Sequence, residues 1–114
     1  MSKTPGKIWL ERFVKTSLDL VILGLLEEKE RWGYEINMQI KDKFEVYLSA
    51  GTLYPLLHEL EEKGFIEGIW EADKGRGRRI YRISPKGKEF LINGEKSLDD
   101  FLKRIRIGQE PSQP

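Results

Sequence analysis

The sequence predicts a mainly α-helical domain that carries one small β-hairpin. Apolar residues recur at helical spacing through most of the 114 residues, and two β-rich runs flank the short segment DKGRG. The chain has no cysteine, which excludes a disulfide framework, and its 39% hydrophobic and 34% charged residues are typical of a soluble globular protein. A chain of this length forms one domain with one modest core.

Two helices are expected in the N-terminal part of the chain. The segment IWLERFVKTS, residues 8–17, places Trp9 and Phe13 four positions apart, as on one face of a short amphipathic helix. Thr16 or Ser17 then caps a second helix, LDLVILGLLEE, residues 18–28. Because this helix is apolar nearly all round, we expect it at the centre of the core.

The segment WGYEINMQIKDKF, residues 32–44, supports two interpretations. The alternation of polar and apolar residues from Tyr34 to Ile40 is typical of a strand. Ile36, Ile40 and Phe44 are also spaced by four, and Glu, Met, Gln and Lys are helix formers. We expect a helix, because the elements that follow favour it.

The segment SAGTLYPLLHELEEKGFI, residues 49–66, predicts a capped helix. Its leucines follow the spacing i, i+3, i+4, i+7, which places them in one apolar stripe. Ser49 or Thr52 caps the start of this helix, and Pro55 is expected close to its first turn, where a missing N–H costs little. Gly64 ends the helix.

A β-hairpin, here called the wing, is expected over residues 65–84, with a flexible tip at DKGRG. Tyr81 and Ile83 lie on one face of its second strand and Arg82 on the other. Cross-strand ion pairs are a further expectation, in which Arg79 and Arg82 meet Glu67 or Glu71. We also expect both Trp32 and Trp70 to be packing residues.

A last helix begins at Ser84-Pro85. Leu91, Leu98 and Ile105 are seven positions apart, which is a heptad-like seam, and Asn93-Gly94 weakens it in the middle. The complete order of elements predicts a winged helix-turn-helix with an additional helix at each end. The expected divisions are an N-terminal arm and short helix over 1–16, the winged helix-turn-helix over 17–84, a dimerisation helix over 85–107 and a disordered tail over 108–114.

The distribution of charge indicates a phosphate-bearing partner, although the net charge is only +1. Residues 59–73 hold six acids and one base, whereas residues 74–88 hold seven bases and no acid. Such a basic stretch concentrates polyanions near its surface, and a merely solvated face explains it equally well.

Duplex DNA is the partner that the helix at 49–66 and the wing suggest together. The first half of that helix carries no carboxylate, so its N-terminal N–H groups are available to an anion. Flexible cations at the tip of the wing would reach phosphates or the minor groove. The alternatives are a half-buried packing role for Tyr54, a solvated helix position for His58 and a merely soluble turn at the wing tip. The expected DNA-binding residues are Ser49, Thr52, Tyr54, His58, Lys74, Arg76 and Arg78.

A homodimer is expected, because the first and last helices both carry apolar stripes that one small chain cannot cover. Two copies would present their DNA-reading helices to a pseudo-palindromic operator. The expected interface residues are Trp9, Phe13, Phe90, Leu91, Leu98, Phe101, Leu102 and Ile105.

Enzymatic activity is not expected. The chain has one histidine, no cysteine, no glycine-rich phosphate loop and no acidic or histidine cluster at metal-ligand spacing, so neither a metal nor another cofactor is predicted. The longest apolar run, Leu20 to Leu26, is too short to cross a bilayer, and the N-terminal segment lacks the apolar core of a signal peptide. We therefore expect a cytoplasmic protein without a membrane partner.

The segments LDLVILGLLEE, WGYEINMQI, SAGTLYPLLHELEEKGFI and GRGRRIYRISPKGKEFL together resemble the PadR family of transcriptional regulators. The resemblance implies a winged-helix dimer that represses transcription and releases DNA on binding a small aromatic or hydrophobic effector. It also implies that Thr52, Tyr54 and Arg78 contact DNA. The chain departs from many family members at Trp32. It is also short after Gly87, as in the smaller branch of the family, so we expect no large separate effector domain.

An effector pocket lined by Trp9, Phe13 and Phe101 is one interpretation of the aromatic residues in the end helices, and a dry dimer core is the other. Two other functions stay open beside the DNA-binding regulator. One is a winged-helix protein-interaction module that does not bind DNA, and the other is a protein that senses or sequesters a hydrophobic compound.

Overall fold

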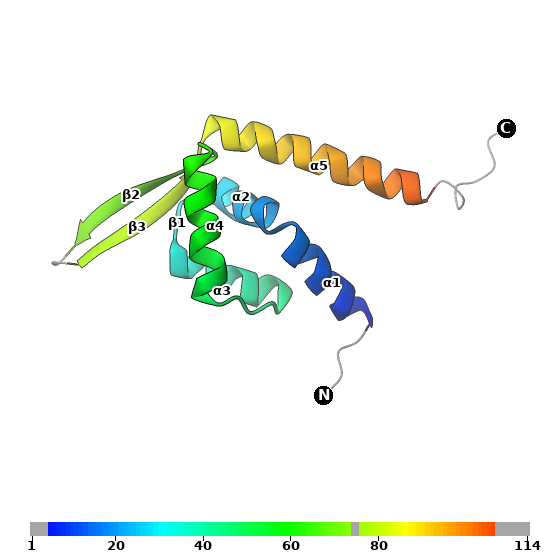
Figure 1. The fold of residues 1–114 in the computed structure, drawn as a ribbon, viewed down its shortest axis with the longest axis horizontal. Helices are drawn as coiled ribbons and strands as arrows, with labels where there is room; N and C mark the ends of the chain where they lie inside the picture. The colour runs from blue at the N-terminus through cyan, green and yellow to red at the C-terminus, as the bar shows by residue number, and fades with distance from the viewer. Residues whose placement is uncertain (1–4, 74–75, 107–114) are drawn as a thin grey trace.

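The structure, a computed structural model, describes residues 5–73 and 76–106, without the side chains of residues 5, 72, 73 and 76–78. The predicted tail over 108–114 lies outside the described residues. Figure 1 shows a body of packed helices from which the hairpin projects at one end, while the first and last helices extend at the other. The elements in order are α1 (Pro5–Thr16), α2 (Leu18–Glu28), β1 (Arg31–Trp32), α3 (Gly33–Phe44), α4 (Ala50–Glu62), β2 (Ile66–Asp73), β3 (Arg76–Ile83) and α5 (Pro85–Ile105).

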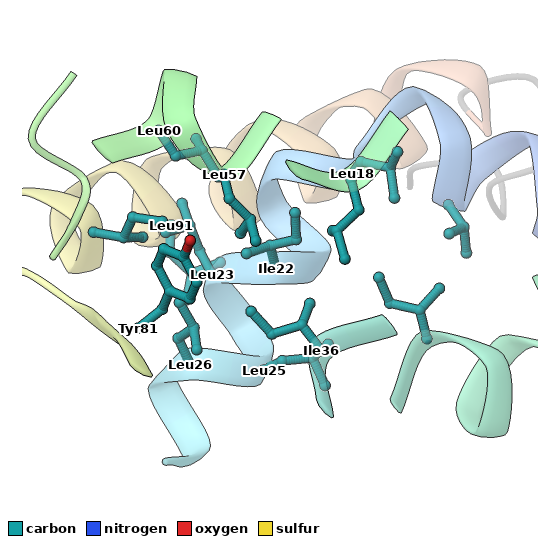
Figure 2. Close-up of a cluster of buried hydrophobic side chains, with 14 of the residues drawn as sticks. Leu18, Ile22, Leu23, Leu25, Leu26, Ile36, Leu57, Leu60, Tyr81 and Leu91 are labelled. Carbon is teal, nitrogen blue, oxygen red and sulfur yellow. The ribbon is translucent and has the colours of Figure 1, made fainter. Parts of the chain in front are cut away.

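Helix α2 is the centre of the core, as predicted. Ile22 and Leu23 are completely buried in it, and they are surrounded by side chains from α3, α4, β3 and α5. Figure 2 shows how leucines of α4 and Tyr81 of β3 converge on α2 from different sides. Each fully buried aliphatic side chain of this kind contributes about 1.5–3 kcal/mol to stability.

The ambiguous segment forms a helix, which confirms the expectation for residues 32–44. In α3, Ile36 and Ile40 are completely buried, whereas Tyr34 and Met38, which share the alternating pattern, are exposed. Spacing by four therefore determines which face is buried. Trp32 lies before the helix, in the two-residue strand β1, which no sequence pattern predicted.

The wing consists of β2 and β3, which pair antiparallel from Ile66↔Ile83 to Asp73↔Arg76. Strand β1 adds to the other side of β3, so the sheet order is β1-β3-β2. The predicted cross-strand pair of Arg82 with Glu67 is present, with Nε 2.8 Å from Oε1. Arg79 does not pair with either predicted glutamate and instead reaches Glu61 in α4, a correction considered below.

Helix α4 ends as predicted, whereas its start differs in detail. Gly64 follows the helix at φ +79°, a left-handed conformation that favours glycine. Ser49 occupies the N-cap position, and its hydroxyl lies 3.2 Å from the Thr52 hydroxyl instead of capping a backbone N–H. Pro55 lies inside the helix, further from its start than predicted.

Helix α5 is continuous from Pro85 to Ile105, through Asn93 and Gly94. An added Cβ at Gly94 would lie 2.5 Å from a methyl carbon of Leu20, and the glycine thus allows α2 and α5 to approach closely. At the start of α5, Ser84 accepts a hydrogen bond from the Gly87 N–H (3.0 Å) and donates one to the Gly64 carbonyl (2.6 Å). This serine therefore joins the end of α4 to the start of α5.

Candidate nucleic-acid interface

The first half of α4 presents hydroxyl and imidazole groups to solvent. Ser49, Thr52, Tyr54 and His58 are all exposed, as their predicted role requires. The apolar stripe of Leu53, Leu57 and Leu60 on the opposite face anchors the helix to the core. The sequence thus fixes which side of α4 faces outward through the burial of its leucines.

The carboxylates in the second half of α4 have separate partners. The Glu59 carboxylate lies 3.6 Å from the Lys63 ammonium, and the Glu62 carboxylate lies 3.6 Å from Nε2 of His58. Both pairs are exposed, and they are spaced i,i+4 along the helix. The third carboxylate of this half, that of Glu61, instead contacts the wing.

Tyr54 packs against the start of α3 and is also exposed to solvent. Its ring lies over Gly33 at the start of α3, where an added Cβ would be 2.7 Å from Cε1 and 2.9 Å from the hydroxyl oxygen. The residue nevertheless keeps 44% of its surface exposed. The predicted DNA contact and the packing alternative are therefore compatible for this side chain.

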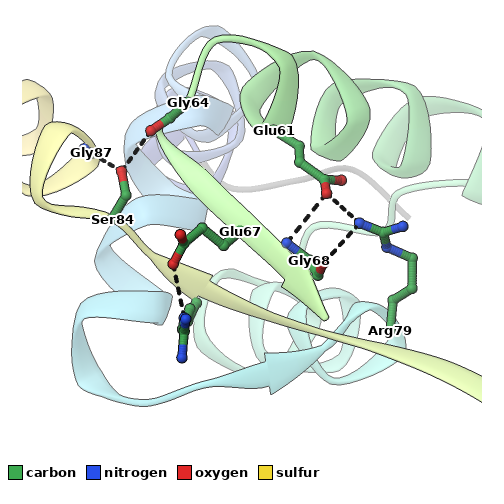
Figure 3. A network of polar contacts seen from close by, with 8 residues as sticks. Glu61, Gly64, Glu67, Gly68, Arg79, Ser84 and Gly87 are labelled. Carbon is green, nitrogen blue, oxygen red and sulfur yellow. Dashed lines mark hydrogen bonds and ion pairs between the residues drawn. The ribbon is translucent and has the colours of Figure 1, made fainter. Parts of the chain in front are cut away.

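A polar bridge joins α4 to both strands of the wing. Glu61 pairs with Arg79 of β3, and Oε2 of Glu61 accepts a hydrogen bond from the Gly68 N–H of β2 at 3.3 Å. Nη2 of Arg79 also donates to the Gly68 carbonyl at 3.1 Å, so the three residues form one closed network (Figure 3). Since Gly68 has no Cβ, the Arg79 guanidinium can lie directly across β2.

The cations predicted for the wing tip are placed only in part. Arg76 and Arg78 belong to β3, opposite Asp73 and Glu71, and their side chains are not described. Lys74 lies outside the described residues. The structure thus places the backbone of two predicted DNA-binding arginines at the outer end of the wing.

An aromatic pocket of about 470 Å³ lies between α4 and the wing. It is lined by Trp32, Gly33, Tyr34, Tyr54, Trp70, Arg79 and Tyr81. The Arg79 guanidinium lies 5.2 Å from the centre of the Trp70 ring and 5.7 Å from that of Tyr81. Burial raises the pKa of the Tyr81 phenol above its ordinary value.

Three residues of the pocket were missed as functional candidates: Tyr34, Trp70 and Arg79. Trp70 is 64% exposed, so its prediction as a packing residue is wrong, whereas Trp32 is half-buried. The available signal was the alternation of side chains in β2, which places Trp70 on the face opposite the neighbouring acids. Nothing in the sequence indicated that the start of α3 would lie beside the wing.

Exposed apolar side chains gather on α1 and α5. Trp9 and Phe13 are in contact, with ring centres 5.6 Å apart, and each is more than half exposed. Leu91, predicted for the same surface, is instead buried in the core of its own chain, because the first part of α5 packs against α2 and the sheet. Leu102 is half-buried. The predicted interface residues that are exposed are Trp9, Phe13, Phe90, Leu98, Phe101 and Ile105.

Neither a membrane span nor a metal centre is found among the residues described. Over 5–73 and 76–106, every helix is too short or too polar to cross a bilayer. The same ranges contain no group of three or more His, Cys, Asp or Glu side chains arranged to hold a metal ion.

Comparisons with known proteins agree with this geometry. The profile of the "Transcriptional regulator PadR-like family" matches residues 22–93. The chain is 33% identical over 100 residues to the transcriptional regulator Rv3488 of Mycobacterium tuberculosis, covering 88% of this chain and 92% of that protein.

Solved structures of the same family superpose well. A PadR family transcription regulator from Clostridium difficile has a TM-score of 0.66 at 32% identity, over 79% of this chain and 94% of that one. A PadR-like transcriptional regulator from Bacillus cereus has a TM-score of 0.73 at 26% identity, over 89% and 99%. The chain belongs to the PadR-like family of transcriptional regulators.

Proposed function

We propose that this PadR-like regulator binds duplex DNA sequence-specifically, with α4 in the major groove and the wing beside it. The observation that carries the proposal is the exposed first half of α4, which has no carboxylate from Ser49 to His58 and stands next to the wing. Helix-turn-helix proteins read base edges with the N-terminal part of such a helix. Hydroxyl groups like that of Thr52 suit phosphate oxygens and base edges.

The proposed functional unit is a homodimer formed through α1 and α5. Exposed aromatic and aliphatic side chains on these helices form an apolar surface of the kind that marks protein interfaces. A second copy carries the same surface, and a two-fold axis would pair them and present two α4 helices to a pseudo-palindromic operator. We expect such a protein to act in the cytoplasm.

Repression, and release of DNA by a small aromatic or hydrophobic effector, complete the proposal. Trp9, Phe13 and Phe101 support the effector site, because all three rings are about half exposed in the isolated chain. In a dimer these rings would provide flat apolar walls for a planar compound.

Binding to the DNA immediately upstream of the protein's own gene tests the proposal. Affinity is measured at two salt concentrations for this duplex and a scrambled one, with the wild type and an Arg76→Ala/Arg78→Ala variant. We expect preference for the upstream duplex, weakened by salt and by the variant, because cations on the wing displace counterions from phosphates.

A Lys29→Ala/Lys96→Ala variant is the matched control, since it removes the same charge from exposed positions that belong neither to α4 nor to the wing. Equal effects of the two double substitutions would contradict a specific role of the wing. Equal, weak binding to both duplexes would contradict sequence-specific recognition.

A further inference from the structure

We infer that the aromatic pocket between α4 and the wing holds the sugar–phosphate strand that separates the two DNA grooves contacted by the protein. The inference rests on the proposed function and extends it to residues that the sequence did not mark, Tyr34 and Trp70 above all. It assigns them contacts with the backbone of DNA rather than with its bases.

The position of the pocket is the first argument. Its lining comes from three parts of the chain: Tyr54 of α4 on one wall, Trp70 and Arg79 of the wing on another, and Tyr34 from the start of α3. A major groove and the adjacent minor groove are separated by one sugar–phosphate strand. When α4 enters the first groove and the wing enters the second, that strand must cross the space between them, which is this pocket.

The chemistry of the walls is the second argument. Trp70 is 64% exposed and Tyr34 is 46% exposed, although both rings lie in a hollow of the surface. Exposed ring faces can pack against the apolar edge of a deoxyribose, and the tyrosine hydroxyls can donate hydrogen bonds to phosphate oxygens. The Trp32 ring, which also lines the pocket, lies 5.5 Å from the Tyr34 ring between centres and packs against it.

The electrostatics of the pocket permit an anionic strand. No residue that lines the pocket is an acid, and the carboxylate of Glu61 beside it is paired with the lining residue Arg79. The Tyr81 phenol is neutral at ordinary pH, and burial raises its pKa further. The lining therefore offers hydroxyl donors without a carboxylate among them, which suits a phosphate group better than a cation.

The bridge of Glu61, Arg79 and Gly68 sets the width of the pocket. It ties α4 to β2 through the Gly68 N–H and to β3 through Arg79, so the two walls cannot separate without breaking these contacts. Glu61 and Arg79 are thus positioning residues for the strand, whereas Tyr34 and Trp70 would touch it.

Neutral methylphosphonate groups, placed one at a time in the upstream duplex, test the inference. With the wild type, we expect one backbone position between the two groove contacts at which the substitution lowers affinity about tenfold, the effect of losing a hydrogen bond to a charged group. The Tyr34→Phe variant should bind every unmodified duplex about tenfold more weakly, the scrambled one included. At the sensitive backbone position, the methylphosphonate group should cause no further loss of affinity in this variant, because the hydrogen bond is already absent.

Tyr47→Phe is the matched control, because Tyr47 is exposed but does not line the pocket, and it should bind as the wild type does. Trp70→Ala should likewise lower affinity for both duplexes, and thermal unfolding of each variant shows that the fold is kept. Wild-type affinity in both Tyr34→Phe and Trp70→Ala would overturn the inference while leaving the proposed function intact. Failure of the wild type to prefer the upstream duplex would overturn the proposed function instead.

Discussion

Replacing Glu61 by glutamine should destabilise the chain more than the same replacement of Glu67, a glutamate of the wing. The Glu61 and Arg79 side chains are 30% and 27% exposed, whereas Glu67 and Arg82 are 54% and 50% exposed. Exposed pairs contribute about 0–1 kcal/mol, and completely buried pairs cost about 3–5 kcal/mol when one partner is removed. The half-buried position of Glu61 lies between these limits.

The expected loss in free energy of unfolding for Glu61→Gln is about 1–2 kcal/mol. The substitution removes the charge that balances Arg79 and weakens the acceptor of the Gly68 N–H, and each such hydrogen bond contributes about 1 kcal/mol. For a domain of this size the melting temperature should fall by about 4–8 °C. Glu67→Gln should lower it by less than Glu61→Gln does, about 4 °C at most, because that pair is exposed.

Thermal unfolding followed by circular dichroism at one fixed protein concentration measures both variants. The concentration must be the same, because association changes the apparent stability. The reasoning would be refuted if Glu61→Gln and Glu67→Gln lowered the melting temperature equally. A second readout is the effect of Arg76→Ala on DNA affinity, which should shrink in the Glu61→Gln background because the wing is no longer held.

Three further predictions follow from packing, exposure and pH. Gly33→Ala should lower stability by about 1 kcal/mol or less in denaturant unfolding, less than an overpacked core costs: the added Cβ would lie 2.7 Å from the Tyr54 ring, but the outer end of this half-exposed side chain can move, and a loss of several kcal/mol would contradict that mobility. Phe101→Asp should give monomers in sedimentation, because it places a charge in the proposed dimer interface. The circular dichroism spectrum should stay unchanged, because the Phe101 side chain is 52% exposed in the single chain. The pKa of Glu28 is lowered, mainly by its hydrogen bond to Lys43. The ionised carboxylate therefore stabilises the fold above pH 4.5, and this stabilisation is lost as the pH falls through the lowered pKa. The melting temperature of the wild type should thus drop between neutral pH and a pH below the lowered pKa, and the drop should be smaller in Glu28→Gln.

Elements with a local signal were predicted well. The leucine stripe from Leu53 to Leu60 determines the buried face of α4, and Gly64 ends that helix in the conformation that glycine favours. The same holds for α2, whose apolar surface on nearly all sides requires a central position. In α3 two periodicities competed, and packing of Ile36 and Ile40 against the rest of the core favoured the helix.

Contacts between elements distant in sequence were not predicted, because no local pattern encodes them. Arg79 was expected to pair within the hairpin, but the closest carboxylate belongs to Glu61, a residue of another element. Strand β1 has only two residues, and it forms because β3 offers a free edge beside it. Leu91 fits a heptad seam and is nevertheless buried within its own chain, since periodicity does not distinguish a protomer core from an interface.

The candidate site shows the same division. The exposure of Thr52 and His58 follows from the helical phase of α4, so it could be predicted from the sequence. The aromatic pocket requires α3, α4 and the wing to meet, and Tyr34 and Trp70 therefore became candidates only in the folded chain.

The most direct test of the central claim, that α4 reads DNA sequence, is the affinity of a Thr52→Ala/Tyr54→Phe variant for the upstream duplex and for a scrambled duplex of equal length. We expect the variant to lose this preference, so that its affinity for the upstream duplex falls toward its affinity for the scrambled one. Undiminished preference for the upstream duplex in the folded variant would contradict the assignment of α4 as the DNA-reading helix.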